Sequence, residues 1–187
     1  MEFTSVKIDF IDNPALSLIP IQSTDQPFLY NLMDEIYRYS YRYIWKDDGD
    51  WYMNLIYNPD TVEKELSRNR THYFFVEVEN RKIGILKYDF PFSPREIDIP
   101  DSMKLHRLYL HPDFHGKRIA QVLLNHCEEV AKSNNLKSIW LEAMECQPQA
   151  RRFYEKMGFE TLMKYQLDFE VMLPEYRGIN IMKKSLI

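Results

Sequence analysis

The feature that most constrains the fold of this chain is an alternation of strand and helix patterns across residues 104–158. A strand pattern at 104–110 leads through a polar loop into an amphipathic helix pattern, whose apolar positions recur at i, i+3 and i+4: 119, 122, 123, 127 and 130. A second strand at 138–142 leads into a helix that opens at Pro148 and stops at Gly158. This alternation predicts a mixed α/β fold.

The remaining patterns predict further strands and helices around this unit. A turn at 79–81 separates two alternating apolar runs, which is typical of a hairpin. Elsewhere, we expect strands at about 16–21, 159–169 and 179–186, and helices at about 25–39, 51–57 and 61–68. A chain of 187 residues suits one domain, and burying roughly 70% of its surface is enough for a core without disulfides or metals. We therefore expect a single domain over residues 1–187.

The charge and cysteine content exclude several classes of partner. The formal net charge is −4, which argues against a general nucleic-acid or anionic-membrane binder. The charge is −7 over residues 1–103 and +3 over residues 104–187, so the second half better suits an anionic ligand and the first half a cationic one. Cys127 and Cys146 form no CxxC motif, so neither zinc nor a disulfide framework is expected. Without a secretory start or an 18-residue apolar stretch, the chain is expected in the cytoplasm.

A polar segment at residues 111–120 lies between the strand at 104–110 and a helix that we expect over about 117–133. The start of a helix has unpaired backbone N–H groups and the positive end of the helix dipole, so such a loop can bind a phosphate or pyrophosphate. Every strand-to-helix turn shares part of this geometry. A plain turn is therefore the alternative interpretation.

Two motifs, in order and at the right spacing, resemble the GNAT superfamily of N-acetyltransferases. The run from Leu108 to Leu124 is similar to the superfamily's acetyl-CoA motif, whose loop reads Arg/Gln-x-x-Gly-x-Gly/Ala and here reads His-Gly-Lys-Arg-Ile-Ala over 115–120. The run at 141–160 is similar to the second motif, in which a strand leads to Asn, two residues, Ala, then Phe-Tyr, three residues and Gly-Phe. The resemblance is close over 104–160 and looser over the preceding hairpin.

Two residues depart from these motifs. Arg118 stands where the loop has its central Gly, and Gln147 stands where the second motif has its Asn. We expect Arg118 to lie in the first helical turn, where no positive φ is needed, and its guanidinium to offer a charge-assisted contact to a CoA phosphate. Gln147 retains a side-chain amide, which lies one methylene further from the backbone than that of Asn. Both changes leave the anion site in place and leave room for a weakened binder.

The resemblance implies a mixed central sheet of about six to seven strands flanked by helices, with acetyl-CoA bound where the parallel strands at 104–110 and 138–142 splay apart. The pantetheine arm would meet the backbone of the first strand at Leu108, Tyr109 and Leu110. The pyrophosphate would meet the amides of six loop residues, which are His115, Gly116, Lys117, Arg118, Ile119 and Ala120.

The resemblance also implies direct attack of an amine on the thioester of acetyl-CoA. Gln147, Ala150 and Tyr154 match superfamily positions along the CoA arm. Tyr154 would donate a proton to the CoA sulfur, because a phenol with an ordinary pKa near 10 suits a leaving thiol of similar basicity. A packed tyrosine on an amphipathic helix is the alternative.

Two side chains are candidates for the group that accepts the amine's proton. His106 is similar by position to one of the paired strand histidines of serotonin N-acetyltransferase, and its ordinary pKa near 6.5 suits proton transfer at pH 7. Strict alternation would place His106 on one strand face with Lys104, Leu108 and Leu110. Glu142, at the end of the partner strand, is the second candidate, and a chain of water molecules is the third route.

Residues 22–70 correspond to the variable acceptor-side helices of the superfamily. Tyr37, Tyr41 and Trp45 recur every four residues, so one helical face would line the acceptor site; the alternative is that these rings belong to the core. The aromatic faces and the negative first half favour a cationic amine. The acidic run at 47–50 is either a solvated loop or part of that cationic site.

We therefore expect an acetyl-CoA-dependent N-acetyltransferase that uses no metal and acts on a small-molecule or protein amine. The alternative is a degenerate GNAT domain that binds acyl-CoA as a sensor or interaction module without catalysis. A homodimer is compatible with the sequence but is not indicated by it.

Overall fold

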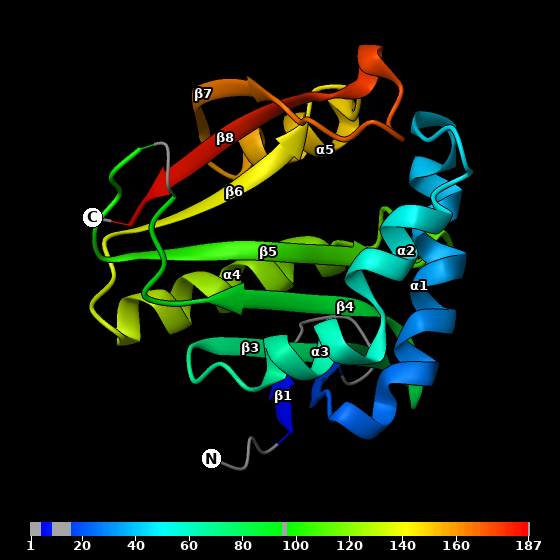
Figure 1. Ribbon diagram of the computed structural model, residues 1–187. Helices are drawn as coiled ribbons and strands as arrows, with labels where there is room; N and C mark the ends of the chain where they lie inside the picture. The colour runs from blue at the N-terminus through cyan, green and yellow to red at the C-terminus, as the bar shows by residue number, and fades with distance from the viewer. Residues whose placement is uncertain (1–4, 9–15, 95–96, 187) are drawn as a thin grey trace.

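The computed structural model describes residues 5–8, 16–94 and 97–186. Its centre is one eight-stranded sheet with the order β1-β2-β3-β4-β5-β6-β8-β7 (Figure 1). Every neighbouring pair is antiparallel except β5 and β6, which are parallel. The strands are β1 (Val6–Ile8), β2 (Leu16–Pro20), β3 (Thr71–Val78), β4 (Arg81–Asp89), β5 (Ser102–Leu110), β6 (Ser138–Met144), β7 (Glu160–Gln166) and β8 (Gly178–Ser185).

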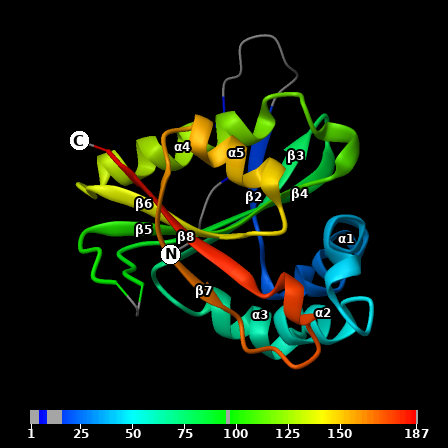
Figure 2. The same ribbon diagram turned by 90° about the horizontal axis from the view of Figure 1, so that it is seen from above.

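Helices cover both faces of this sheet. Figure 2 shows α4 and α5 on one face and α1, α2 and α3 on the other. The helices are α1 (Gln26–Tyr41), α2 (Asp50–Ile56), α3 (Pro59–Leu66), α4 (Ile119–Ser133) and α5 (Pro148–Lys156). This arrangement confirms the predicted mixed α/β sheet, with one strand more than the expected six to seven: β1, in a region without a clear pattern, pairs with β2.

Local sequence signals account for the helix boundaries. The Asn58 side chain caps α3 by accepting the Thr61 N–H at 2.8 Å, and Pro59 occupies the first helical position, where no N–H is needed. Pro148 begins α5 in the same way. Just beyond α5, Gly158 has a φ of 87°, a left-handed conformation that glycine adopts without strain.

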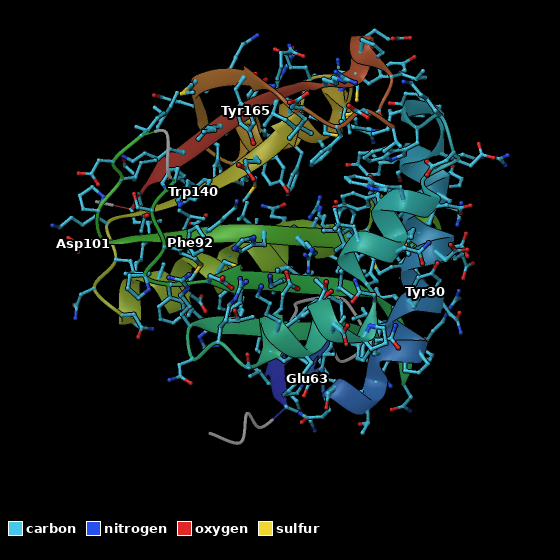
Figure 3. The ribbon with its side chains drawn as sticks, in the orientation of Figure 1. Tyr30, Glu63, Phe92, Asp101, Trp140 and Tyr165 are labelled. Carbon is cyan, nitrogen blue, oxygen red and sulfur yellow. The ribbon has the colours of Figure 1, made fainter. Side chains whose placement is uncertain are left out.

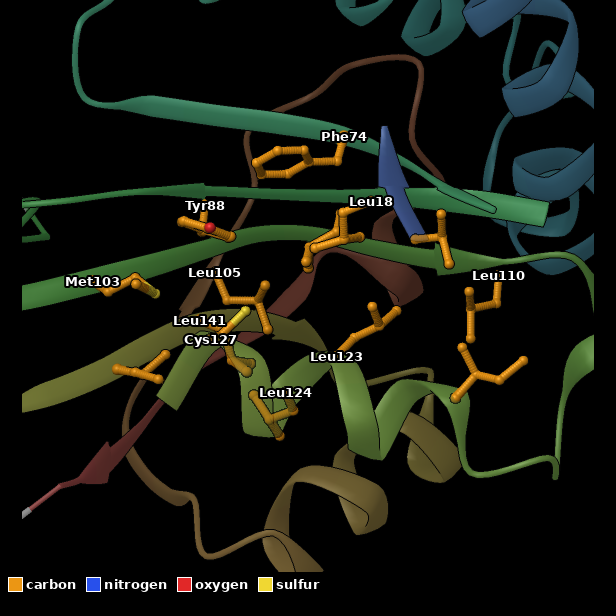
Figure 4. Close-up of a cluster of buried hydrophobic side chains, with 14 of the residues drawn as sticks. Leu18, Phe74, Tyr88, Met103, Leu105, Leu110, Leu123, Leu124, Cys127 and Leu141 are labelled. Carbon is orange, nitrogen blue, oxygen red and sulfur yellow. The ribbon is translucent and has the colours of Figure 1, made fainter. Parts of the chain in front are cut away.

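The two faces of the sheet bury different cores. The face covered by α4 is mainly aliphatic, with Leu105, Leu123, Leu124 and Cys127 among its buried members (Figure 4). The face covered by α1–α3 is rich in aromatic residues, and its fully buried Tyr57 and Phe75 belong to that second core. Each core removes a continuous apolar surface from water, which fixes the helices against the sheet.

The parallel pair separates part of the way along its length, as predicted. Backbone pairing runs from Ser102 opposite Ser138 to Leu105 opposite Leu141 and then ends. Beyond that point β5 stays paired with β4, and β6 stays paired with β8. Figure 1 shows the two strands diverging from this crotch toward α1 and α2. The gap therefore has two strand edges that no other strand covers.

A β-bulge at this crotch corrects one prediction. Lys87 lies opposite Arg107 and Tyr88 lies opposite Leu105, so His106 is the extra residue in β5. The bulge interrupts the strict alternation that would have put Lys104, His106, Leu108 and Leu110 on one face. Leu108 and Leu110 instead pack with Leu105 on the α4 side of the sheet.

Among the described residues, no helix combines the length and apolar character needed to cross a membrane.

Candidate functional site

The loop before α4 presents a run of unpaired backbone amides. Within the described parts of the chain, no acceptor lies on the N–H groups of residues 116–121, and the first bonded amide is Val122, at 3.2 Å from the Arg118 carbonyl oxygen. Gly116 and Arg118 both have positive φ, 75° and 61°. Such left-handed residues gather successive N–H groups into concavities that bind anions, and the α4 dipole adds positive potential there. The geometry therefore fits the predicted pyrophosphate site.

The expected conformation of Arg118 is wrong. Arg118 is the N-cap of α4 with a φ of 61° and ψ of 6°, so it precedes the first turn, and the helix begins at Ile119 rather than near Lys117. A non-glycine residue in this left-handed region raises the conformational free energy of the folded chain by roughly 1–2 kcal/mol, whereas the glycine of the similar motif does not. Arg118 and Lys117 are exposed, so their cations remain available to a phosphate group beside the free amides.

The open edge of β5 supplies further backbone groups. His111 N–H donates to the Ile83 carbonyl of β4 at 2.7 Å, and the two-residue alternation of a strand then turns the backbone of Leu108 and Leu110 away from β4, toward the gap. The Leu110 carbonyl is held there by a ring nitrogen of His115 at 2.9 Å. Gly84 permits this arrangement, because a Cβ on it would lie 2.1 Å from the Tyr109 carbonyl oxygen. This arrangement is compatible with a CoA arm beside Leu108, but the Leu110 carbonyl is already bonded and the backbone of Tyr109 faces β4, so the contacts with CoA stay a prediction.

The start of α5 is tied to the end of α1 across the far end of the gap. The Gln147 side-chain amide donates to the Ser40 carbonyl at 2.9 Å and to the Tyr43 hydroxyl at 3.3 Å. Ala150 follows on α5 and is half-buried. The predicted CoA contact of Gln147 therefore competes with a tether that the sequence did not indicate, while Ala150 keeps its expected place.

Tyr154 lies on the same helix and is packed against the aliphatic core. Its ring contacts the rings of Phe153 and Phe159, with centroids 5.2 and 5.6 Å apart. Burial, and then the nearby Cys127 thiol, raise the pKa of Tyr154 above its ordinary value of 10. Tyr154 is also one of the groups whose electrostatic influence raises the pKa of Tyr41, after burial. A phenol of raised pKa stays protonated at neutral pH and can still donate, but it is a weaker acid than the leaving thiol, so the pKa match on which its role was predicted does not hold.

On the opposite side of the crotch, Glu142 is held by two donors. Lys104 Nζ lies 2.7 Å from Glu142 Oε2, and the Tyr165 hydroxyl donates to Glu142 Oε1 at 2.8 Å. Burial would raise the pKa of Glu142, but the Lys104 ammonium and the Tyr165 hydrogen bond outweigh it and lower that pKa. Glu142 is therefore ionised at neutral pH and able to accept a proton, although it is a weak base.

His106 differs from its predicted state. Its Nε2 lies 3.3 Å from Asp89 Oδ2. Burial lowers the pKa of His106 to about 4, although the Asp89 carboxylate acts in the other direction. The ordinary pKa on which its role as a base was predicted does not apply, because this imidazole is neutral at pH 7 and holds a proton poorly.

A pocket of about 400 Å³ opens beside the Lys104–Glu142 pair. Figure 3 shows Phe92 and Trp140 on the side where β5 and β6 are still paired, and Tyr165 on β7, beyond β6. Pockets of this size bind small molecules. The residues that line it are Arg70, Pro91, Phe92, Ser93, Pro94, Lys104, Trp140 and Glu142.

Most of these lining residues were not predicted. They come from the turn before β3, the loop after β4, and the paired ends of β5 and β6, and no short motif links these segments. One signal was available: Lys104 and Glu142 carry opposite charges on strands that the resemblance already made neighbours. Their register, Lys104 opposite Trp140, follows only once the pairing is known.

A buried ionic cluster lies under α3, next to the bulge. Arg107 donates to both carboxylate oxygens of Glu65, at 2.7 and 2.9 Å, and Lys87 Nζ lies 2.8 Å from Glu65 Oε1. Burial, followed by the Arg107 charge, lowers the pKa of Lys87 to about 8. The cluster fixes Arg107 directly after His106, and so it holds the bulged segment of β5 against α3.

The predicted aromatic wall is only partly open. Tyr37 stacks between Tyr41 and Tyr52, with centroid distances of 4.8 and 4.5 Å, and its hydroxyl accepts the Trp45 indole N–H at 3.1 Å. Tyr37 and Trp45 are 3% and 4% exposed, so in this structure they are core residues. Tyr41 is the more exposed member of the trio and lies nearest Tyr154.

The acidic loop at 47–50 is a self-contained turn rather than an open negative patch. Asp48 pairs with Arg42 at 2.7 Å and Asp50 pairs with Arg38 at 2.6 Å. Asp47 accepts two backbone N–H groups of the same loop. These contacts satisfy the carboxylates locally, which removes this part of the argument for a cationic acceptor.

Across residues 5–8, 16–94 and 97–186, no group of three or more His, Cys, Asp or Glu side chains lies close enough to hold a metal ion.

Comparison with known proteins identifies relatives for most of the chain. The acetyltransferase (GNAT) family matches residues 28–159. An uncharacterized N-acetyltransferase encoded in the pepI 3′ region of Lactobacillus delbrueckii subsp. lactis is 22% identical over 141 residues, which are 75% of this chain and 80% of that protein.

Solved structures share the fold. The PaiA N-acetyltransferase of Thermoplasma acidophilum in complex with coenzyme A superposes with a TM-score of 0.70 at 19% identity, over 91% of this chain and 98% of that one. A spermidine N-acetyltransferase SpeG chimera from Vibrio cholerae and hSSAT superposes with a TM-score of 0.65 at 20% identity, over 91% and 95% of the two chains. At 19% and 20% sequence identity, these superpositions show that the fold is shared and no more than that.

Proposed function

Because the chain belongs to the acetyltransferase (GNAT) family, we propose that it transfers the acetyl group of acetyl-CoA to an amine that binds in the pocket beside Glu142. One observation carries this proposal: the gap between β5 and β6 has unpaired backbone amides at one end and a small pocket at its crotch. A thioester lying along the gap would then meet an amine from the pocket.

The residues at the gap fit the co-substrate. Amides of residues 116–121 would receive the pyrophosphate, and the cations of Lys117 and Arg118 lie in the same loop. The open backbone of Leu108 would pair with the amide groups of the pantetheine arm, with the half-buried Ala150 on the other side. Leu110 would contribute its N–H, because its carbonyl already binds His115. The relation of Gln147 to CoA stays a prediction, since its amide already binds the Ser40 carbonyl.

Acetyl-CoA supplies the activated acetyl carbon, and the protein positions the groups that exchange protons. The amine nitrogen forms a bond to that carbon while the carbon–sulfur bond breaks. Tyr154, protonated at neutral pH, would give its proton to the leaving sulfur. The amine's proton would pass to the Glu142 carboxylate, directly or through water, because Glu142 is ionised whereas His106 holds a proton poorly.

The alternative is a domain of the same family that binds acyl-CoA as a sensor without catalysis. Three observations favour it: Arg118 replaces the flexible glycine of the loop, the Gln147 amide is already engaged, and the pKa of His106 is about 4. None of these affects Tyr154 or Glu142, and we therefore propose the enzyme first.

Two measurements test the proposal. Isothermal titration calorimetry measures whether acetyl-CoA binds, and a thiol assay measures free CoA released with a panel of small amines and lysine-containing peptides. We expect binding together with amine-dependent release of CoA. Binding without turnover on any amine would support the sensor alternative, and absence of binding would contradict both.

The cellular setting of this reaction is part of the proposal. We propose a cytoplasmic enzyme, which agrees with Cys127 and Cys146 being free thiols. A homodimer stays a prediction, which size-exclusion chromatography with light scattering would test.

A further inference from the structure

Among the described residues that line the pocket beside Glu142, more carry a positive than a negative charge. Arg70 and Lys104 contribute two cations, and Glu142 contributes one carboxylate. That carboxylate is already engaged on both oxygens, by Lys104 at 2.7 Å and by the Tyr165 hydroxyl at 2.8 Å. The charge left for a ligand is therefore positive, and it belongs to Arg70.

Arg70 is exposed and is placed against the wall of the pocket. Its guanidinium carbon lies 4.6 Å from the centre of the Phe92 ring, a cation–π contact. The Arg70 carbonyl accepts the Phe90 N–H at 3.2 Å, which ties the turn before β3 to the loop after β4. Among the described residues, no carboxylate lies within ion-pair distance of Arg70.

Phe92, on which Arg70 lies, is itself fixed by three hydrogen bonds. Its N–H donates to the Ser102 carbonyl at 2.8 Å, and its carbonyl accepts the Ser102 hydroxyl at 2.9 Å and the Trp140 indole N–H at 2.6 Å. A fixed support of this kind lowers the entropy that is lost when a ligand binds. The guanidinium is thus presented on a rigid wall.

We propose that this pocket takes an acceptor that carries a carboxylate as well as its amine, with the carboxylate on Arg70 and the amine toward Glu142. The volume of about 400 Å³ suits a molecule of the size of an amino acid or a dipeptide. A planar guanidinium matches a carboxylate with two parallel hydrogen bonds, which is why Arg suits this task. The inference rests on the proposed acetyl transfer for its kinetic test but concerns a binding preference that can be measured without turnover.

This inference reverses the sequence-based preference for a cationic amine. That preference relied on the negative charge of the first half of the chain and on an open aromatic wall. In the structure, the acidic loop is paired with Arg38 and Arg42, and Tyr37 and Trp45 are buried. The side chains that do line the pocket carry the opposite charge.

The test compares acceptors that differ only in the carboxylate. The panel pairs each amino acid, from glycine to tryptophan and including β-alanine and γ-aminobutyrate, with its carboxamide, and adds spermidine as a cationic amine. Steady-state release of CoA is measured for the wild type, Arg70→Gln and Arg68→Gln. Arg68→Gln is the matched control. It removes the same charge at a position two residues before Arg70, and the Arg68 side chain does not line the pocket.

In the wild type, we expect the best amino acid to exceed its carboxamide and spermidine at least tenfold in kcat/KM. Arg70→Gln should remove about tenfold of that preference, equivalent to about 1.4 kcal/mol, and leave the carboxamide within about twofold. Arg68→Gln should change neither acceptor by more than about twofold. Equal rates for acid and amide in the wild type, a spermidine preference, or an Arg70→Gln loss shared by acid and amide would each overturn the inference.

A binding measurement separates this inference from the proposed function. With CoA present, calorimetry measures the affinity of the same amino acids and carboxamides for each variant. If no amine is acetylated but amino acids bind tighter than their amides, and Arg70→Gln abolishes that difference, the carboxylate site stands and the proposed reaction fails. If amines are acetylated without any such difference, the reaction stands and the carboxylate site is wrong.

Discussion

The two ends of the β5–β6 gap are built in different ways. The end at which we propose that the cofactor binds, called here the cofactor end, consists of backbone: one loop, residues 111–118, and the first turn of α4 supply the unpaired amides of residues 116–121. The end at which we propose that the acceptor binds, called here the acceptor end, consists of side chains from segments far apart in the sequence, such as Arg70, Phe92 and Glu142. The first end depends on a local chain conformation, and the second depends on tertiary packing.

Because the two ends are built differently, they tolerate different amino-acid substitutions. A backbone site keeps its donors under most substitutions and loses them only when φ changes or when an opposing charge is introduced. A side-chain site loses one specific contact with each substitution and responds to pH through its titratable groups. The predictions below test that contrast.

The largest effect is expected from a negative charge at the cofactor end. Gly116 has a φ of 75°, and a Cβ there would meet nothing within 4 Å. Gly116→Asp would place a carboxylate beside the pyrophosphate, so we expect the Kd for CoA to rise by about 100-fold, equivalent to about 2.7 kcal/mol.

Gly116→Asn is the control for that variant, because Asn has nearly the same shape and also tolerates positive φ. We expect Asn to raise the Kd for CoA, measured by calorimetry, by less than about tenfold. Equal losses for Asp and Asn would mean that the loop does not lie against a phosphate.

The next effect concerns Tyr154 on α5. Tyr154→Phe removes one proton donor and keeps the packing of the ring against Phe153 and Phe159. We expect kcat to fall about 10- to 100-fold and the Kd for CoA to stay within about threefold. Unchanged kcat, with an unchanged thermal unfolding midpoint, would assign Tyr154 to packing alone.

A smaller effect tests the pH sensitivity of the acceptor end. The pKa of His106 is about 4 in the folded protein and 6.5 when unperturbed, so the unfolded chain binds the additional proton. The contribution that His106 makes to the free energy of unfolding is therefore fully present above pH 6.5 and is lost as the pH falls toward 4. With 17% of the side chain exposed, we expect this loss to be on the order of 1–2 kcal/mol rather than the full linkage value.

His106→Gln should remove that part of the pH dependence, measured by urea unfolding at pH 7, 6 and 5. His115→Gln, a substitution in the cofactor loop, should keep the wild-type dependence. If the two variants behave alike, His106 is not the group that couples folding to pH in this range.

The smallest effect concerns the strained N-cap of α4. Arg118 has a φ of 61°, so Arg118→Gly should be more stable than Arg118→Ala by about 1 kcal/mol, the reverse of their order inside a helix. Chemical denaturation of the two variants measures this difference. A more stable Ala variant would show that residue 118 adopts a right-handed conformation in solution.

The same contrast explains what could be predicted from sequence. Helix periodicity, Pro148 and Gly158 determine local structure, so α4 and α5 were predicted from the residues, whereas the splayed parallel pair was implied by the family resemblance. The free amides of the loop follow from that local structure, and their contact with the pyrophosphate stays a prediction.

The acceptor end was predicted poorly because its properties arise from packing. The bulge at His106 depends on how β4 pairs with β5, and it redirected Leu108 and Leu110. The low pKa of His106 comes from burial, which no spacing of residues reveals. Tyr37 and Trp45 have the spacing of an exposed aromatic wall, but helix packing turned them into core.

A crystal structure with CoA and an amino acid bound would test the central claim most directly, namely that the two ends serve one reaction at the β5–β6 gap. We expect pyrophosphate oxygens on the amides of residues 116–121, the sulfur within about 3.5 Å of the Tyr154 hydroxyl, the ligand carboxylate on Arg70 and its amine facing Glu142. CoA bound outside the gap, or a sulfur remote from both Tyr154 and the pocket, would contradict it.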